Sequence, residues 1–250
     1  MNRMATAFAN IGSIQPAHGA SKAWLAHLDL LKHVYQSNLD TALILEDDVD
    51  WDIAIRQQMQ NISSAVRTLT QTPANEPAPF GRGWDVLWLG LCVEHWMDNT
   101  TRVEFDDANV CPHEDYRSWR AEELAQIPNH KRAVWWSNGP VCTFAYAVSH
   151  KGARRILKRL GGGWAEAFDL GLRSECYYHL NCISVVPEVF HQYFPPSEFG
   201  VKSNVDEGND RDGDPGPPDD DFESEMGSTE NIVHSARCRA LWGKDCQYRG

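Results

Sequence analysis

The chain has 250 residues, of which 42% are hydrophobic, and this suits one large domain with a sizeable core. Its formal net charge is −12 and it has no dense run of Lys and Arg, so nucleic acid is not an expected partner, because phosphate binding needs a basic footprint. No window approaches the roughly 18 apolar residues of a membrane-spanning helix, so no membrane span is expected.

A helix and then a strand are predicted near the start of the chain. Four apolar residues, spaced by four, three and four positions, predict a helix from Ser21, its N-cap, to about Asn38. They are Trp24, Leu28, Leu31 and Tyr35. The stretch TALILE at 41–46 is a short apolar run bounded by charge, which predicts a buried, parallel strand. A helix followed by a strand is typical of an α/β fold.

The middle of the chain continues this alternation. A helix is predicted over 53–69, and QTPANEPAPFGRG at 71–83 predicts a surface loop, because it holds three prolines and two glycines. WDVLWLGLCV at 84–93 predicts another apolar strand. The interval 94–131 is polar and without a strong period, and we expect a helical turn or two over 120–126.

Two more strands and a helix are predicted next. RAVWW at 132–136 and VCTFAYAVS at 141–149 predict strands on either side of the turn residues SNGP. Ser149 is expected to cap a helix over 150–160, which ends at the triple glycine 161–163.

A final helix and strand precede a change of composition. AFDLGLRSECYY at 167–178 predicts the helix, and CISVVPEVF at 182–190 predicts the strand. The stretch 204–225 is acidic, rich in Gly and Pro and almost free of large apolar residues, which predicts a disordered or loosely held loop.

These patterns divide the chain into three predicted regions. They are a partial N-terminal segment at 1–18, one α/β domain at 19–195, and the acidic loop with a C-terminal tail at 196–250.

The chain has seven cysteines, and this odd number does not indicate a disulfide framework in a chain of this length. The sequence has no CxxC pair, so it gives no sign of a zinc site. Cys92 and Cys142 fall within apolar strands, where a cysteine is expected to be a small core residue.

Five carboxylates lie at 46–52, at the end of the predicted strand and directly after it. If the chain stays extended, alternate residues share a face, so Glu46, Asp48 and Asp50 point one way and Asp47 points the other. Such a cluster at the carboxyl end of a strand lies where open α/β sheets bind ligands. It predicts a site for Mg²⁺ or Mn²⁺, which take oxygen ligands. The alternative is a solvated acidic turn.

Two further carboxylates lie in the predicted helix at 167–178. Asp169 is our candidate for a general base and Glu175 is the second choice. The alternative for Asp169 is a structural role, as a carboxylate that interacts favourably with the first turn of a helix.

Several blocks, in this order, resemble glycosyltransferase family 25, which includes bacterial lipooligosaccharide galactosyltransferases and collagen galactosyltransferases. The blocks are GASKAWLAHLDLLKHV, ALILEDDVDWD, WDVLWLG, CTFAYAVSHKGARRIL and FDLGLRSECYYHLNCISVVPEVFHQY. The closing STENIVHSAR and the acidic loop before it look most like fungal members.

The resemblance implies a GT-A-like nucleotide-sugar-binding fold, with a mostly parallel central sheet flanked by helices. It also implies a UDP-sugar donor and a divalent ion, Mn²⁺ or Mg²⁺, held by Glu46, Asp47 and Asp48, with Asp50 added by the DxD-like spacing of DVD. His27 would line the donor pocket.

The resemblance extends to the end of the next strand, where Trp88 and Gly90 would border the same cleft. Two features depart from the family pattern. Trp24 and Ala26 stand where Cys and Ser are common. Only 18 residues precede the first block, too few for a first strand–helix unit of about 30 residues, which predicts an N-terminally incomplete fold.

The expected function is metal-dependent transfer of a hexose such as galactose, with inversion, from a UDP-sugar to a glycan or glycoprotein. One alternative is a non-catalytic remnant of that family that binds a glycan or a partner. Another is a metal-dependent phosphohydrolase, since acidic strand ends also serve phosphoryl chemistry. A location in the secretory pathway is expected if an anchor precedes the chain, and a soluble protein otherwise.

Overall fold

The structure is a computed structural model that describes residues 18–94, 100–118, 121–163, 166–196 and 225–248. In chain order the elements are α2 (His18–Gln36), β1 (Thr41–Leu45), β2 (Val49–Trp51), α3 (Ile55–Leu69), β3 (Val86–Gly90), β4 (Arg102–Asp106), α4 (Ala121–Leu124), β5 (Lys131–Trp136), β6 (Ala145–Ser149), α5 (His150–Leu160), α6 (Phe168–Tyr178), β7 (Cys182–Val186), β8 (Phe190–Phe194), β9 (Ser228–Thr229) and α7 (Ala236–Trp242). Most of the predicted N-terminal segment and of the acidic loop lies outside the described residues.

Six strands form the central sheet, in the order β1-β6-β3-β7-β5-β4, and a smaller sheet has the order β2-β8-β9. The α/β class is confirmed. The prediction of a mostly parallel sheet is wrong, because only β3 and β7 are parallel among the paired strands of the central sheet that the structure describes. An apolar run shows that both faces of a strand are covered, but it does not fix the direction of the neighbouring strands.

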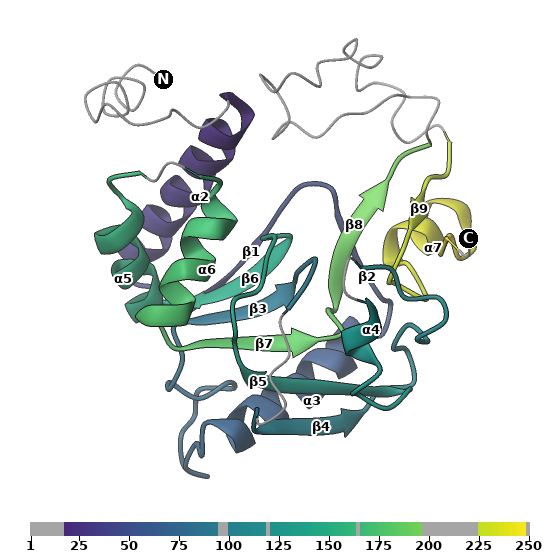
Figure 1. The fold of residues 1–250 in the computed structure, drawn as a ribbon, viewed down its shortest axis with the longest axis horizontal. Helices are drawn as coiled ribbons and strands as arrows, with labels where there is room; N and C mark the ends of the chain where they lie inside the picture. Colours follow the sequence, from purple (N-terminus) through teal and green to yellow (C-terminus); the bar gives the residue numbers. More distant parts are fainter. Residues whose placement is uncertain (1–17, 95–99, 119–120, 164–165, 197–224, 249–250) are drawn as a thin grey trace.

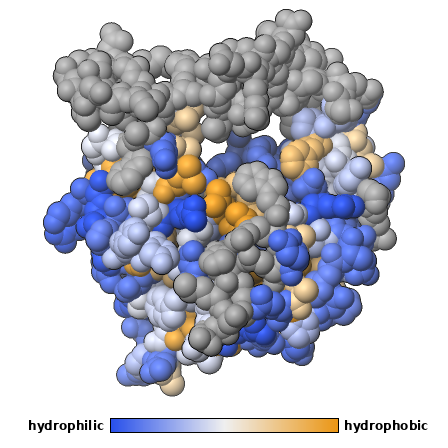
Figure 2. All heavy atoms as spheres, viewed as in Figure 1, coloured by the Kyte–Doolittle hydropathy of each residue, from blue (hydrophilic) through white to orange (hydrophobic). Residues whose placement is uncertain are grey.

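Helices cover both faces of the central sheet (Figure 1). α2, α5 and α6 pack together on one face, where Trp24, Leu28 and Leu31 of α2 are fully buried against Trp88 and Tyr146 of the sheet. α3 lies on the other face, against β4 and β5. The face seen in Figure 1 is mostly hydrophilic at its rim, while hydrophobic residues gather toward its middle (Figure 2).

β1 is an edge strand, and its predicted burial and parallel pairing are wrong. Among the described strands it pairs with β6 alone, and it does so antiparallel. Ile44 is buried on the side of α2, whereas Leu43 and Leu45 are 46% and 38% exposed. These two side chains point to the opposite face, where α3 makes its most extensive strand contacts with β4 and β5, at the other edge of the sheet.

One end of the central sheet brings distant segments together. β1 and β3 end there and β6 begins there, since Leu45 and Gly90 both pair with Ala145. α6 begins at the same end, because Asp169 in its first turn accepts a hydrogen bond from Cys142. The topology therefore places the acidic end of β1 beside the start of α6.

The helices expected from local patterns are confirmed. α3, α5 and α6 match the ranges predicted for them, α2 starts three residues before the predicted one, and α4 falls within the predicted turns at 120–126. The Ser149 hydroxyl accepts a hydrogen bond of 3.0 Å from the N–H of Gly152, so the predicted cap of α5 is confirmed. Ser21 is not a cap, because it lies inside α2.

The strands depart further from the prediction. The run at 182–190 contains β7 and the start of β8, which belong to different sheets. β5 and β6 are not neighbours, because β7 and β3 lie between them. β4 was not predicted, since its sequence RVEFD is largely polar and only partly buried.

Disulfides join six of the cysteines, and the prediction against a disulfide framework is wrong. The pairs are Cys92–Cys142, Cys176–Cys182 and Cys238–Cys246, with Cα–Cα distances of 5.5, 5.4 and 6.1 Å. Cys92 and Cys142 are not core residues within strands, because β3 has ended before the first and β6 has not begun at the second. Cys111 is buried and is not part of a disulfide.

The helices that the structure describes lack the combined length and apolar character needed to cross a bilayer.

Candidate functional site

The acidic stretch after β1 forms a turn and does not stay extended. The N–H of Glu46 donates a hydrogen bond to the carbonyl of Phe144, and residues 47–48 then turn before β2 begins in the smaller sheet. The predicted shared face of Glu46, Asp48 and Asp50 is therefore wrong, because alternation holds only along a continuous strand.

Asp50 is 1% exposed and binds the C-terminal segment. Its carboxylate accepts hydrogen bonds from the Ser235 hydroxyl and, at 3.2 Å, from the N–H of Arg237. Its proposed place among the metal ligands is therefore not supported by the geometry, since these donors use both oxygens of a fully buried carboxylate.

Glu46 ends a chain of polar contacts that reaches into the core. The Thr143 hydroxyl donates to Glu46 Oε1 at 3.0 Å and lies 3.4 Å from Nε2 of His27. Nδ1 of His27 lies 3.1 Å from the Tyr146 hydroxyl. One assignment of protons satisfies all four groups: Tyr146 donates to His27, His27 to Thr143, and Thr143 to Glu46. β6 supplies Tyr146, and Thr143 lies two residues before this strand.

His27 is held as a neutral ring. It comes from the middle of α2 and stacks on Phe168 of α6, with ring centroids 4.4 Å apart and an interplanar angle of 7°. Burial lowers the pKa of His27 to about 4. Its Nε2 lies 3.9 Å from Oε1 of Glu46. Because the ring is neutral, this contact is not an ion pair.

Asp169 reaches the same place from the first turn of α6. Its Oδ2 accepts a hydrogen bond of 2.9 Å from the N–H of Cys142, which is disulfide-bonded to Cys92. Cys142 has a φ of 69°, a left-handed conformation that is uncommon outside glycine and that directs its N–H in this loop. The predicted base is thus fixed to the loop that also supplies Thr143.

The carboxylates at this end of the sheet repel one another. Burial, together with the charges of Asp48, Asp169 and Asp47, raises the pKa of Glu46 to about 7, against the hydrogen bond from Thr143, which lowers it. Burial also raises the pKa of Asp48, although Gln192 donates a hydrogen bond of 2.9 Å to its Oδ2. Negative charge here is not fully balanced, which favours a cation.

The residues partly fit a divalent ion. Asp48 Oδ1 is buried and has no hydrogen-bond partner, and a carboxylate oxygen in that state suits a hard cation. Within the described ranges, no group of three or more His, Cys, Asp or Glu side chains converges as a metal site. Mg²⁺ commonly binds through one or two carboxylates, with water and substrate phosphates as further ligands, and this set could supply the protein's share.

Glu175 lies in α6 on the side of α5, where its carboxylate is paired with Arg159. It is therefore held by a structural ion pair, and its proposed role as a base is not supported by the geometry.

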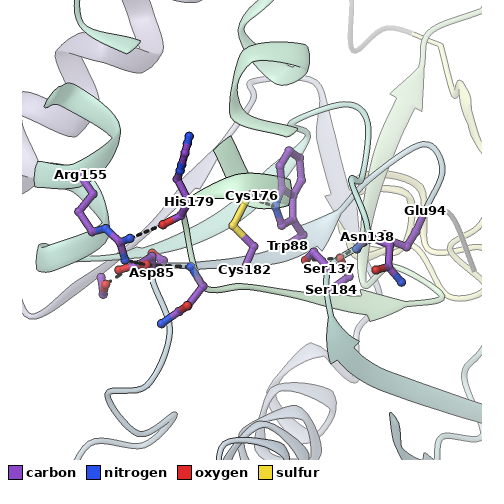
Figure 3. The surroundings of a disulfide bond; sticks show 12 residues. Asp85, Trp88, Glu94, Ser137, Asn138, Arg155, Cys176, His179, Cys182 and Ser184 are labelled. Carbon is purple, nitrogen blue, oxygen red and sulfur yellow. Dashed lines mark hydrogen bonds and ion pairs between the residues drawn. A yellow bond between two sulfur atoms is a disulfide. The ribbon is translucent and has the colours of Figure 1, made fainter. Parts of the chain in front are cut away.

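Trp88 and Gly90 lie behind the site and do not face solvent. Trp88 is fully buried, and its Nε1 lies 3.5 Å from Sγ of Cys176 beside the Cys176–Cys182 disulfide (Figure 3). A Cβ on Gly90 would lie 2.9 Å from both Ala145 N and Phe190 O. Gly90 thus allows close packing of β3 under β6 and β8. The geometry therefore supports neither Trp88 nor Gly90 as part of a donor cleft.

The sequence did not point to three residues of this site, Thr143, Tyr146 and Gln192. Polar groups in the apolar run VCTFAYAVS were a possible signal for the first two, since buried hydroxyls need partners. Gln192 gave no signal, because its link to Asp48 joins positions 144 residues apart.

No model of a known protein family matches the chain, and no curated protein matches it. The likeness to glycosyltransferase family 25 therefore rests on the sequence blocks and their order.

Proposed function

We propose that the protein is a glycosyltransferase of GT-A type that transfers a hexose such as galactose, with inversion, from a UDP-sugar to a glycan or glycoprotein. The observation that carries this proposal is the gathering of Glu46, Asp47, Asp48 and Asp169 at one end of the sheet, with a buried oxygen of Asp48 left unpaired. The order of the sequence blocks supports it independently.

The proposed ion is Mn²⁺ or Mg²⁺, held by Glu46 and Asp48, with Asp47 nearby. Such an ion supplies Lewis-acid stabilisation of the leaving diphosphate. The chain's own contribution is a set of carboxylates whose mutual repulsion is relieved when a cation binds.

Asp169 is the proposed general base. A carboxylate that takes the proton of the acceptor hydroxyl must be held within hydrogen-bond reach of it. The N–H of Cys142 holds one oxygen of Asp169, and the start of α6 favours its negative charge. His27, Thr143 and Tyr146 are buried beneath Glu46 and serve to orient it.

The alternative proposal is a non-catalytic member that binds a glycan or a partner. Asp50 favours it, because this residue of the DxD-like pair is occupied by the C-terminal segment, and so does the lack of a three-residue metal group among the described side chains.

Calorimetry with UDP-galactose, with and without Mn²⁺, tests the proposal. We expect binding heat that requires Mn²⁺ and that is lost in Asp48→Asn. Asp29→Asn is the matched control, because Asp29 is exposed on α2 and its carboxylate pairs with Lys32 of the same helix. Absence of binding in both conditions would overturn the enzyme proposal. Phosphate release from simple phosphate esters would favour a phosphohydrolase instead.

The disulfides support a location in the secretory pathway. Disulfides persist in oxidising compartments and are rare in the reducing cytosol. Glycoprotein acceptors would be met in the same compartment.

A further inference from the structure

A cavity of about 600 Å³ lies at the end of the central sheet where β1 starts and β6 ends. Residues of three segments line it, namely the approach to β1 at 38–41, the loop 78–82 and the start of α5 at 149–151. β1 extends from this cavity to the acidic turn (Figure 1), a length of about 14 Å from Thr41 to Leu45. The cavity is therefore separate from the candidate metal site.

The loop wall of this cavity is fixed by side chains from outside the loop. The guanidinium of Arg67 in α3 donates hydrogen bonds to three carbonyls of the connection between α3 and β3, at 2.7 to 3.1 Å. The Ser63 hydroxyl donates to the carbonyl of Pro79, and Nε1 of Trp84 donates to the carbonyl of Phe80 at 2.9 Å. A loop held in this way offers a preformed wall, so a ligand does not have to order it on binding.

Two cations line the cavity, and their head groups keep donors for a ligand. The side chains of Arg82 and Lys151 are each 58% exposed. Arg82 donates through Nε to Glu76 at 3.1 Å, whereas its Nη2 lies 3.8 Å from Asp40, beyond hydrogen-bond distance. Nζ of Lys151 lies 3.6 Å from the buried carboxylate of Asp85, which is also too far for a hydrogen bond. Positive charge is thus gathered here, although the chain has a formal net charge of −12.

The other lining groups suit a saccharide better than an acidic peptide. Asn38, Asp40 and Thr41 supply an amide, a carboxylate and a hydroxyl, which are groups that pair with sugar hydroxyls. Phe80 adds apolar surface on which the face of a sugar ring can pack. A run of acidic side chains would instead meet the like charge of Asp40.

We propose, independently of the function at the acidic end of the sheet, that this cavity binds an acidic saccharide. The carboxylate or sulfate group of the ligand engages Arg82 and Lys151 in charge-assisted hydrogen bonds, and its ring hydroxyls pair with the groups at the start of β1. The volume of the cavity lies within the range of about 300–1,000 Å³ that is usual for small-ligand sites.

Calorimetry with tetrasaccharides of alternating glucuronic acid and N-acetylglucosamine, with and without sulfate, tests this proposal. A chelator is present throughout, so the result does not depend on the acidic site. We expect at least one of the two to bind, with an affinity that falls as salt is added. The neutral tetrasaccharide of N-acetylglucosamine and a peptide of four glutamates should each bind at least about tenfold more weakly, because each lacks half of the required chemistry.

The double variant Arg82→Gln with Lys151→Gln should weaken binding of the acidic tetrasaccharide about tenfold, as for two exposed charge pairs. Arg56→Gln with Lys158→Gln is the matched control, since it removes the same two charges from exposed positions outside the cavity. Thermal unfolding of both proteins checks that they are folded. The proposal is overturned if neither acidic tetrasaccharide binds, if the two double variants lose affinity equally or not at all, or if the neutral tetrasaccharide or the peptide binds as tightly.

Discussion

The N–H of Cys142 donates a hydrogen bond of 2.9 Å to Oδ2 of Asp169, and the same residue is cross-linked to Cys92, 50 positions away in the sequence. The disulfide thus fixes the loop before β6 and, through one hydrogen bond, the carboxylate at the start of α6. Thr143, the next residue, contacts Glu46. One short loop therefore positions two of the four carboxylates of the candidate site.

Replacing Cys92 and Cys142 with Ala should lower the free energy of unfolding by about 2–4 kcal/mol, because the cross-link restricts the unfolded chain. It should also weaken the proposed sugar transfer, since the cross-link no longer fixes the N–H that holds Asp169. Unfolding in urea and transfer rates measure the two effects. The double variant of Cys176 and Cys182 is the control, because it removes a disulfide that lies behind Trp88 and does not contact Asp169 in the described contacts. Equal loss of transfer in both would contradict a special role for the first disulfide.

Thr143→Val should weaken Mn²⁺ binding several-fold, because Glu46 loses the donor that orients it. The free energy of unfolding should fall by about 1 kcal/mol for the lost hydrogen bond. Thr143→Ser keeps the hydroxyl and should retain most of the affinity. Calorimetry with Mn²⁺ compares them, and similar affinities for Val and Ser would rule out the orienting role.

Glu46→Gln should make the metal-free protein more stable at pH 8 than the wild type. Burial raises the folded-state pKa of Glu46 to about 7, above its ordinary value of 4.5, so its favourable contribution is present below pH 4.5 and is lost as the pH rises through 7. Gln keeps an oxygen for Thr143 and does not ionise. The gain at pH 8, relative to pH 5, should be about 1–2 kcal/mol after allowance for screening of a side chain that is one-third exposed.

Urea unfolding at pH 5 and pH 8, with chelator present, measures the Glu46 effect. Asp29→Asn, at an exposed position, should show no such pH dependence. The expectation fails if Glu46→Gln and the wild type keep the same stability difference at both values.

His191→Gln should be most damaging below about pH 6.5. Burial alone would lower the pKa of His191, but the nearby carboxylates of Glu188 and Glu230 raise it to about 9. Its Nδ1 lies 3.0 Å from Glu188, which also accepts from Tyr116 at 2.7 Å. The charged pair therefore stabilises the fold below the unfolded-state pKa of 6.5, and that contribution disappears as the pH rises through 9.

The pH-dependent part of the loss in His191→Gln should be about 3 kcal/mol at pH 6 and close to zero above pH 9.5. Unfolding free energies at pH 6, 8 and 10 measure it. His113→Gln serves as the control for removing a histidine, because the hydrogen bond from His113 to Asn129 is made by its backbone N–H, which glutamine keeps. A loss in His191→Gln that is constant with pH would show that the pair is not charged.

Local patterns determined the helices correctly. The spacing of Trp24, Leu28 and Leu31 predicted α2, and the serine at 149 with the glycines at 161–163 bounded α5. These features act within one or two turns of helix, so neighbouring residues suffice to specify them. Apolar runs located several strands for the same reason. They did not predict the order or the direction of the strands in the sheet.

The site was predicted in part. One end of the sheet does bring together the residues that the resemblance to glycosyltransferase family 25 assigned to one site, and their roles there stay predictions. They are Glu46, Asp47, Asp48, Asp169 and His27. Asp50, Glu175, Trp88 and Gly90 do not join them. Asp50 is held by Ser235 and Glu175 by Arg159, whereas Trp88 and Gly90 are packed in the core. Sequence spacing carries no information about such contacts.

The sequence by itself determined the α/β class, the extents of the main helices and the acidic end of β1, because hydrophobic period, helix caps and clustered charge are properties of neighbouring residues. Only the tertiary structure decided which way the strands run, which cysteines pair, and which carboxylates meet. Many of those outcomes depend on contacts between segments far apart in the sequence, such as Cys92–Cys142, 50 residues apart, and Asp50–Arg237, 187 residues apart, and these contacts are fixed only when the whole core packs.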